Sequence, residues 1–140
     1  MERDTDRRPV IRLLEMSRER EKAQTQFYRR LAAQAEELRD QDLAGRLNDL
    51  HADEQHHLSR LTARLLELGG TPRDLPRMEP DPVSLEEWQG LARDREFDEV
   101  AWYEDLMENE LDPHTRALIE EIVESERHHR DYLGGKWMPA

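Results

Sequence analysis

In residues 50–61, LHADEQHHLSRL, a carboxylate and an imidazole interrupt an apolar stripe, and this stretch is the clearest indicator of the fold. Glu54 and His57 lie one helical turn apart, so they share a helix face. Leucines continue that face in both directions: Leu43, Leu47, Leu50, Leu61, Leu65 and Leu68. Gly69-Gly70 ends the pattern. A helix over about residues 42–68 is therefore predicted, with the Glu-x-x-His pair in the middle of its buried face.

The same pattern occurs again near the end of the chain, in Glu126-x-x-His129. Asp112-Pro113 is typical of a helix cap followed by a first-turn proline, and Gly134-Gly135 ends the segment. The stripe of this segment consists of Ile119, Ile122, Glu126, His129 and Leu133. A helix over about residues 113–133 is predicted, and it again carries its Glu and His where apolar residues would be expected.

Each Glu-x-x-His helix is preceded by a helical segment with a different polar pair. Glu21 precedes Tyr28 by seven residues, and Glu96 precedes Tyr103 by seven. Pro9 begins the first of these segments, over about residues 9–39. The capping-box pattern Ser84-Leu-Glu-Glu87 begins the second, over about residues 85–110. The chain is therefore interpreted as an internal duplication, and the short turn inside each half predicts an antiparallel helix pair.

The segment over residues 69–84 contains four prolines and cannot form a helix. Its length of roughly 50 Å when extended exceeds the length of about 40 Å of the preceding helix. It can therefore cross the whole bundle. The predicted fold is an all-α, ferritin-like four-helix bundle of two antiparallel pairs joined by a long crossover loop. Residues 1–140 form one domain in this interpretation, and residues 134–140 form a short tail.

Composition narrows the classes of function. The formal net charge is −12, which argues against a nucleic-acid-binding protein because such proteins need a basic surface. There are no cysteines, so disulfides, thiol nucleophiles and thiolate metal sites are excluded. The chain has no apolar stretch of the roughly 20 residues that a membrane span needs. We expect a cytoplasmic protein with no membrane partner, or one enclosed in a cytoplasmic protein compartment.

The mid-stripe position of four glutamates is the strongest functional signal. Uncompensated charges in a bundle core cost several kcal/mol each, and carboxylates at one level also repel one another. No Arg or Lys falls on the stripes at that level, whereas two divalent or trivalent metal ions would neutralise the cluster. The alternative is a metal-free helical scaffold whose Glu and His residues lie on solvated edges.

The pattern resembles the ferritin-like superfamily, and its rubrerythrin-like and bacterioferritin-like branches most closely. The segments that carry the resemblance are Glu21–Tyr28, Asp53–His57, Glu96–Tyr103 and Ser125–His129. The resemblance implies a di-iron site in which two carboxylates bridge the metals and each metal has one further Glu and one His. By that similarity the bridging ligands are Glu54 and Glu126, and the terminal pairs are Glu21 with His57 and Glu96 with His129.

A seventh carboxylate, Glu99, lies one turn beyond Glu96, at the place where rubrerythrins carry an extra Glu implicated in peroxide chemistry. The resemblance makes it a further metal ligand and a catalytic residue, and the matching position in the first half is Gln24. Tyr28 and Tyr103 are also candidate catalytic residues, predicted to donate hydrogen bonds to the bridging carboxylates; ordinary core packing is the alternative. Asp53 is predicted to orient a histidine of the other half.

The resemblance implies a non-haem di-iron protein that reacts with hydrogen peroxide or dioxygen. A rubrerythrin-like peroxidase is the first hypothesis, and a ferroxidase or iron-storage protein, including an encapsulated one, is the second. The ligand types suit two iron ions but leave manganese or a mixed pair open. The chain lacks the Cys-x-x-Cys iron domain of full-length rubrerythrin, so an external electron donor is expected. A homodimer or larger homo-oligomer is also expected, with Phe27, Leu31 and Leu38 as its candidate surface.

Overall fold

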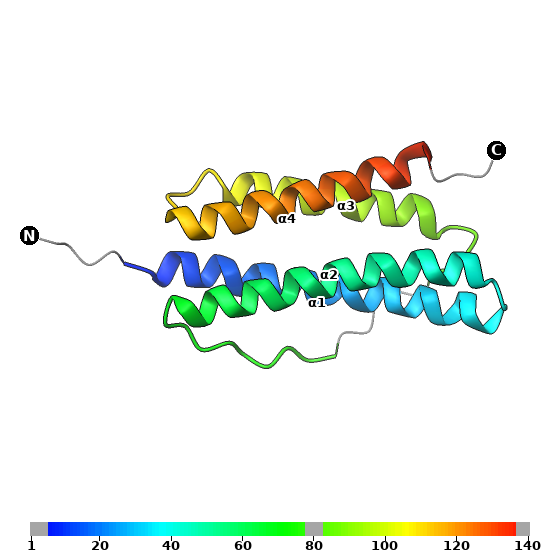
Figure 1. Cartoon of the computed structure of the whole chain (residues 1–140), viewed down its shortest axis with the longest axis horizontal. Helices are drawn as coiled ribbons and strands as arrows, with labels where there is room; N and C mark the ends of the chain where they lie inside the picture. Colours follow the sequence, from blue (N-terminus) through cyan, green and yellow to red (C-terminus); the bar gives the residue numbers. More distant parts are fainter. Residues whose placement is uncertain (1–5, 78–82, 137–140) are drawn as a thin grey trace, which may run out of the picture.

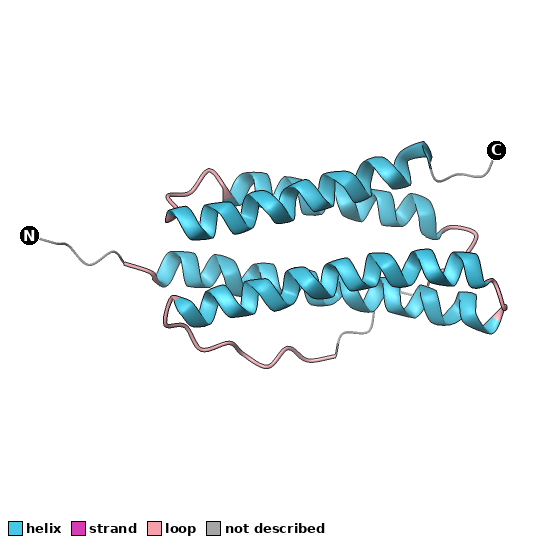
Figure 2. Cartoon of the chain, viewed as in Figure 1, coloured by secondary structure: helices cyan, strands magenta, loops and turns pink. Residues whose placement is uncertain are grey.

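The computed structural model describes residues 6–77 and 83–136. Its elements are α1 (Arg8–Glu37), α2 (Gln41–Glu67), α3 (Trp88–Leu106), α4 (Pro113–Asp131) and a short π-helix, η1 (Tyr132–Lys136) (Figure 1). The described ranges contain no strand (Figure 2). The predicted all-α class is therefore confirmed. Trp137, in the tail, lies outside the described residues.

The helices form two hairpins that lie one above the other in Figure 1. Helices α1 and α2 run antiparallel and make one pair, and α3 and α4 make the second. The described part of the crossover after α2, up to residue 77, runs back along this first pair. As a result, α1 and α4 point in the same direction, and each Glu-x-x-His helix faces the opposite pair. The predicted ferritin-like topology is confirmed.

Aspartate caps explain where α2 and α4 begin, and Pro9 and Pro113 lie in the first turns of α1 and α4. Asp40 accepts a hydrogen bond from the backbone nitrogen of Leu43, and Asp112 accepts one from Thr115 at 3.1 Å. Each of these aspartates satisfies a backbone donor that a helix leaves unpaired in its first turn.

The third helix is shorter than the sequence indicates. It begins at Trp88 and ends at Leu106, instead of extending over about residues 85–110. Ser84 does not cap it: the backbone nitrogen of Glu87 donates to the carbonyl oxygen of Ser84, which makes a turn before the helix. At the other end, the chain turns after Leu106 to reach the Asp112 cap of α4, and this turn occupies residues that helical periodicity alone would extend.

A buried ion pair fixes the start of the crossover on the first helix pair. Arg18 and Glu15 are both 7% exposed and are paired at 2.5 Å. The Glu15 carboxylate accepts the backbone N–H of Arg73 at 2.9 Å, and Arg18 donates to the carbonyl oxygen of Arg73 at 3.0 Å. A backbone segment without secondary structure is therefore held by charged side chains that are themselves satisfied.

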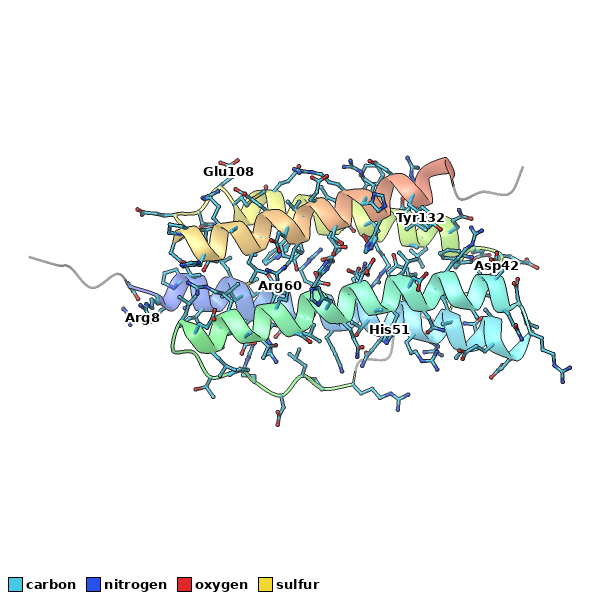
Figure 3. All side chains as sticks on the ribbon, in the orientation of Figure 1. Arg8, Asp42, His51, Arg60, Glu108 and Tyr132 are labelled. Atoms are coloured by element: carbon cyan, nitrogen blue, oxygen red, sulfur yellow. The ribbon has the colours of Figure 1, made fainter. Side chains whose placement is uncertain are left out.

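The core consists of two apolar clusters with a polar layer between them. Side chains fill the space between the helix pairs (Figure 3). One cluster includes Tyr28, Leu31, Ala35, Leu47, Leu50 and Trp88. The other includes Leu14, Leu61, Leu65, Tyr103, Leu106, Ile119 and Ile122. Because the polar layer lies in mid-bundle, it is shielded from water by apolar residues on both sides. Among the described residues, no helix is long and apolar enough to span a bilayer.

The surface predicted for dimer formation is wrong in two of its three residues. Phe27 is 3% exposed and Leu31 is 1% exposed, and both belong to the first apolar cluster. Leu38 is 70% exposed. The face of α1 beside its main stripe packs inside the bundle, because one helix of a four-helix bundle contacts neighbours on more than one side. Phe27 and Leu31 therefore do not form an exposed surface for association of subunits.

Candidate metal centre

The structure brings six buried side chains together in mid-bundle, one or two from each helix. They form two overlapping groups, in each of which one ligand atom per residue lies within 4.8 Å of the others. The first group is Glu21, Glu54, His57 and Glu126. The second group is Glu54, Glu96, Glu126 and His129. Both groups contain Glu54 and Glu126, which is the geometry that two bridging carboxylates require. The assignment of the six residues as ligands stays a prediction.

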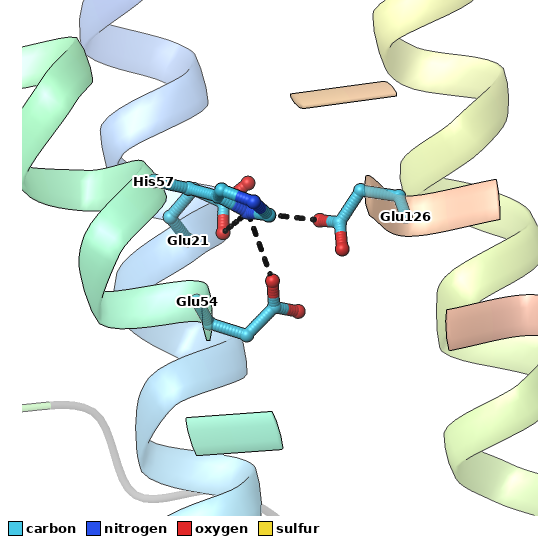
Figure 4. Close-up of side chains that lie close together, drawn as sticks. All are labelled: Glu21, Glu54, His57 and Glu126. Carbon is cyan, nitrogen blue, oxygen red and sulfur yellow. Dashed lines mark ion pairs between the residues drawn. The ribbon is translucent and has the colours of Figure 1, made fainter. Parts of the chain in front are cut away.

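In the first group, the Nδ1 atom of His57 points at carboxylates from three helices (Figure 4). It lies 3.1 Å from Glu54 Oε1, 3.5 Å from Glu21 Oε1 and 3.9 Å from Glu126 Oε2. The three glutamates are fully buried, and the histidine is 5% exposed. The i, i+3 spacing in α2 places Glu54 and His57 on one face, and α1 and α4 supply the opposing carboxylates.

The second group repeats this arrangement around His129. Its Nδ1 atom lies 3.1 Å from Glu126 Oε1, 3.4 Å from Glu96 Oε2 and 4.0 Å from Glu54 Oε1. The ring centroids of His57 and His129 are 6.4 Å apart. Two imidazole nitrogens therefore point at one carboxylate cluster from α2 and α4, and the duplicated sequence pattern becomes an approximate two-fold arrangement in space.

Unsatisfied polar atoms test whether metal ions fit this centre. Among the described residues, buried side-chain atoms without a hydrogen-bond partner include one atom each of five residues of the centre: Glu21 Oε1, Glu54 Oε1, His57 Nδ1, Glu96 Oε2 and Glu126 Oε2. A buried acceptor without a partner costs free energy. These are the oxygen and nitrogen donors that iron or manganese prefers, so the residues fit a pair of such ions.

The electrostatics of the centre without metal show why a cation would be favoured. Burial, together with the negative charges of Glu96 and Glu21, raises the pKa of Glu54 well above its usual value. Burial and the charges of Glu54 and Glu21 do the same for Glu126. Desolvation and repulsion among carboxylates thus favour protonated forms. A bound metal ion would reverse this preference, because it interacts most strongly with the ionised carboxylates.

Both predicted tyrosines contact the centre, but through other carboxylates than expected. The Tyr28 hydroxyl donates to Glu96 Oε1 at 2.9 Å, and the Tyr103 hydroxyl donates to Glu21 Oε2 at 2.5 Å. Each tyrosine therefore binds a predicted terminal ligand of the opposite helix pair instead of a bridging one. Burial and the neighbouring carboxylates raise the pKa of both phenols well above 10, so they remain neutral donors.

Asp53 contacts a histidine of the other half, as its sequence position predicts. Its Oδ2 atom lies 2.8 Å from His129 Nε2, the ring nitrogen that faces away from the centre. Burial lowers the pKa of His129, but hydrogen bonds to Asp53 and Glu96 outweigh burial and raise it from 6.5 to about 10. Carboxylates placed in this way fix the tautomer and orientation of metal-binding histidines. The counterpart of Asp53 in the second half is Ser125, which is not acidic.

Glu99 is buried beside the centre but belongs to neither group of four. Its carboxylate pairs with Arg20, with Nη2 and Oε1 separated by 3.0 Å. Burial raises the pKa of Glu99 from 4.5 to about 7, against the lowering effect of the Arg20 guanidinium. The structure therefore places Glu99 close to the predicted ligands and engaged with an arginine.

Sequence reasoning identified Gln24 only as the counterpart of Glu99, and it missed Arg20 and Arg95. Gln24 is 1% exposed and donates through Nε2 to Glu96 at 2.9 Å and to Glu54 at 3.2 Å. Arg95 donates to Gln24 Oε1 at 2.6 Å, and Arg20 binds Glu99. A signal was present: Arg20 and Arg95 each directly precede the stripe glutamate of their helix. The duplication pairs them, although neither lies on an apolar stripe.

The stability of the metal-free protein is expected to fall as pH rises. The folded-state pKa values of Glu54, Glu126, Glu99 and His129 are all raised above the ordinary values. Above about pH 6, where the carboxyl groups with lowered pKa values, including Glu15, Asp53 and Asp112, are already ionised, the folded protein therefore binds more protons than the unfolded chain. The stabilising contribution of each group with a raised pKa is complete at any pH below its pKa in the unfolded chain. The contribution is lost as the pH rises through its pKa in the folded protein.

His129 has the largest numerical difference between its ordinary pKa, 6.5, and its pKa in the folded protein, about 10. Between pH 6 and pH 9 we expect a loss of about 3 kcal/mol in the free energy of unfolding of the metal-free protein. Urea unfolding in chelator across this pH range measures it. Metal-loaded protein is the control and should show the opposite trend, because metal ions compete with protons. A flat profile for the metal-free protein would contradict the predicted proton uptake.

Comparisons with known proteins bear on the family and the fold of this chain. The chain matches the family model described as Rubrerythrin over residues 12–134. No curated protein matches it. Among solved structures, it is similar to the Desulfovibrio desulfuricans bacterioferritin, whose description refers to a diiron site in different catalytic states. The TM-score is 0.84 at 22% sequence identity, and the alignment covers 94% of this chain and 81% of that chain. This second likeness shows the ferritin-like fold.

Proposed function

This chain belongs to the rubrerythrin family, and on that premise we propose that it is a di-iron oxidoreductase acting on hydrogen peroxide or dioxygen, most specifically a rubrerythrin-type peroxidase. The observation that supports this proposal is the pair of overlapping ligand groups that share two carboxylates. The donor atoms also suit manganese, so a manganese or mixed pair would use the same residues.

The proposed roles follow from position. Glu54 and Glu126 would bridge two metal ions, because each belongs to both groups. We call the place beside Glu21 and His57 the first metal position. The place beside Glu96 and His129 is the second metal position. Each position then has one terminal carboxylate and one imidazole of its own, with apolar clusters above and below that exclude water.

The chemistry that the bound iron pair supplies is the two-electron reduction of peroxide or dioxygen. The residues around it manage protons and geometry. Reduction of hydrogen peroxide to two water molecules consumes two protons, and Glu99, with a pKa of about 7, can hold one on its carboxyl group near neutral pH. Tyr28 and Tyr103 keep Glu96 and Glu21 in place through their hydroxyl groups. An external donor must return two electrons after each turnover.

A ferroxidase is the second candidate, and a surface feature favours it. A groove of about 770 Å³ lies along α4 and is lined by residues that include Asp53, Glu120, Glu121, Glu124, Arg127, His128 and His129. Glu121 pairs with Arg60 and Glu124 with Arg127, so Asp53 and Glu120 supply most of its unneutralised acidic charge. The acidic and imidazole side chains of the groove extend from the surface of α4 to His129, one of the predicted ligands of the centre. Carboxylates along such a groove raise the local concentration of cations, as a protein with ferrous iron as its substrate would need.

Rapid mixing of the ferrous protein with peroxide or dioxygen tests the proposal. We expect peroxide to oxidise the centre at least about tenfold faster than dioxygen, a difference of about 1.4 kcal/mol in activation free energy. Glu99→Gln should slow the peroxide reaction more than the dioxygen reaction, because it removes an ionisable proton carrier. Exposed Glu104→Gln on the same helix is the matched control.

Other outcomes would identify the alternatives. Rapid dioxygen turnover with retained ferric mineral in a large assembly would replace the peroxidase by a ferroxidase. Protein purified without chelator that contains neither iron nor manganese, and that binds neither when they are added, would indicate a metal-free scaffold. Analytical ultracentrifugation of the same samples gives the oligomeric state, which we propose to be a homodimer or larger homo-oligomer.

A further inference from the structure

Two arginines cross between the helix pairs at equivalent positions of the duplication. Each directly precedes the terminal-ligand glutamate of its helix. Arg20 in α1 reaches Glu99 in α3, and Arg95 in α3 reaches Gln24 in α1. Glu99 and Gln24 are themselves equivalent positions. The two arginine contacts are therefore related by the approximate two-fold arrangement. They differ in the group that the arginine binds, which is a carboxylate for Arg20 and an amide for Arg95.

The Arg20 contact holds a carboxylate by both of its oxygens. Arg20 Nη2 lies 3.0 Å from Glu99 Oε1, and Arg20 Nε donates to Glu99 Oε2 at 3.3 Å. The guanidinium also lies 5.1 Å from the ring centroid of Trp102. The indole Nε1 of Trp102 in turn donates to Ser17 Oγ at 3.0 Å. A two-point contact over an anchored aromatic ring fixes the direction of the carboxylate.

The Arg95 contact holds an amide in one orientation. Arg95 Nε donates to Gln24 Oε1 at 2.6 Å, so the Gln24 amide nitrogen faces the centre and donates to Glu96 and Glu54. The Arg95 guanidinium lies 4.4 Å from the ring centroid of Phe27, the equivalent of the Trp102 contact. Since the nitrogen of a carboxamide is a hydrogen-bond donor, Gln24 in this orientation supports ligands but does not act as one.

We propose that Arg20 is a positioning residue that holds Glu99 off the first metal position, and that the Arg95–Gln24 pair is its non-ligating counterpart at the second position. This inference rests on the proposed two-metal function. By the two-fold relation, Glu99 lies on the side of the first position, where the charge of Glu21 acts on it. Release of Glu99 would give the first position a further carboxylate ligand. At the second position the equivalent residue is Gln24, which supplies no further carboxylate, so the two positions are chemically different.

Binding of Co²⁺ to the metal-free protein tests this inference without turnover. Calorimetric titration gives the affinity of each step, and the visible absorption of bound Co²⁺ weakens as its coordination number rises. The variants are Arg20→Gln and its internal control Arg95→Gln, which removes the same charge at the equivalent place. Arg20→Lys keeps a cation that can pair with Glu99. The double variant R20Q/E99Q removes the carboxylate that would be released.

We expect Arg20→Gln to strengthen one of the two binding steps about tenfold more than Arg95→Gln does, the size typical of residues that support metal ligands. The absorption per bound Co²⁺ should fall for that step. Arg20→Lys should behave like the native protein, and R20Q/E99Q should lose the tenfold gain. Arg20 is one-third exposed, so the fold should tolerate these changes. Arg20→Met provides the same comparison if Arg20→Gln does not fold.

Equal effects of Arg20→Gln and Arg95→Gln would overturn the inference, because the gain would then come from charge alone. A gain that persists in R20Q/E99Q would overturn it as well. In both cases the native protein would still bind two Co²⁺ ions, and the proposed function would stand. A native protein that binds fewer than two ions would instead refute the proposed function, and the inference with it.

Discussion

Glu126→Gln is expected to abolish tight binding of both metal ions while leaving the metal-free protein more stable than the native one. Glu126 is fully buried and belongs to both ligand groups. Its replacement removes one negative charge and one strong ligand from each position at almost unchanged volume. The loss of a buried charge interaction of about 3 kcal/mol corresponds to an affinity reduced by about 100-fold at each position. Peroxide turnover should fall at least as far.

The gain in stability of the metal-free variant has the same cause. Burial and neighbouring carboxylates raise the pKa of Glu126 well above its usual value, so its ionised form destabilises the metal-free fold. Removing that charge should stabilise the metal-free protein by about 1–2 kcal/mol near pH 8. Metal titration and urea unfolding of one preparation measure the two opposite effects together.

Glu104→Gln, at an exposed position of α3, is the matched control. The Glu104 side chain is 49% exposed and pairs with Arg127 at 2.8 Å. We expect native metal affinity and a stability change within about 0.5 kcal/mol. If Glu126→Gln bound two metal ions with native affinity, Glu126 would not be a shared ligand. The two-metal interpretation of the centre would then be wrong.

Removal of metal is expected to cause the largest change in stability. At a free metal concentration about 1,000 times the dissociation constant, each ion stabilises the fold by about 4 kcal/mol, or about 8 kcal/mol for two. For a chain of this size, one kcal/mol corresponds to about 2–4 °C in melting temperature. Chelation should therefore lower the melting temperature by about 20 °C relative to the Mn²⁺-loaded or anaerobic Fe²⁺-loaded protein.

Differential scanning calorimetry with and without chelator measures this effect. The double variant E54Q/E126Q is the control, because it lacks both shared carboxylates. Its melting temperature should change by less than about 3 °C when the same metal is added, since little metal binds. A similarly small shift for the native protein would mean that the buried carboxylates do not hold metal, and that their charge is relieved by protons alone.

Much of the fold could be predicted from the sequence because its signals are local. A stripe with helical spacing, such as that around Glu54 and His57, indicates which face is buried without any knowledge of the partner helix. Two glycines after Leu68 and a proline-rich segment then determine where the first helix pair ends. The residues that the structure gathers in mid-bundle could be named in advance because charged residues on such stripes must meet in the core.

Contacts between the helix pairs could not be predicted in the same way. The sequence predicts that Tyr28 and Tyr103 bind bridging carboxylates, yet in the structure they donate to Glu96 and Glu21. The acceptor depends on how far one pair is shifted along the other, and neither hairpin encodes this shift by itself. The burial of Phe27 has a similar origin, because it depends on which neighbours flank α1 and not on its own periodicity.

Local sequence signals alone predict the helical class, the duplicated halves and the six residues that meet in the core. Periodicity, caps and chain breakers each depend on a few neighbouring residues, so all of them can be identified from a single sequence. The pairing of Arg20 with Glu99, and of Arg95 with Gln24, is visible only once the two hairpins are packed together. These contacts join residues more than 70 positions apart, and their geometry depends on the packing of one hairpin against the other. The similarity of the two halves can therefore be predicted from the sequence. The proposed chemical difference between the two metal positions depends on contacts between the halves.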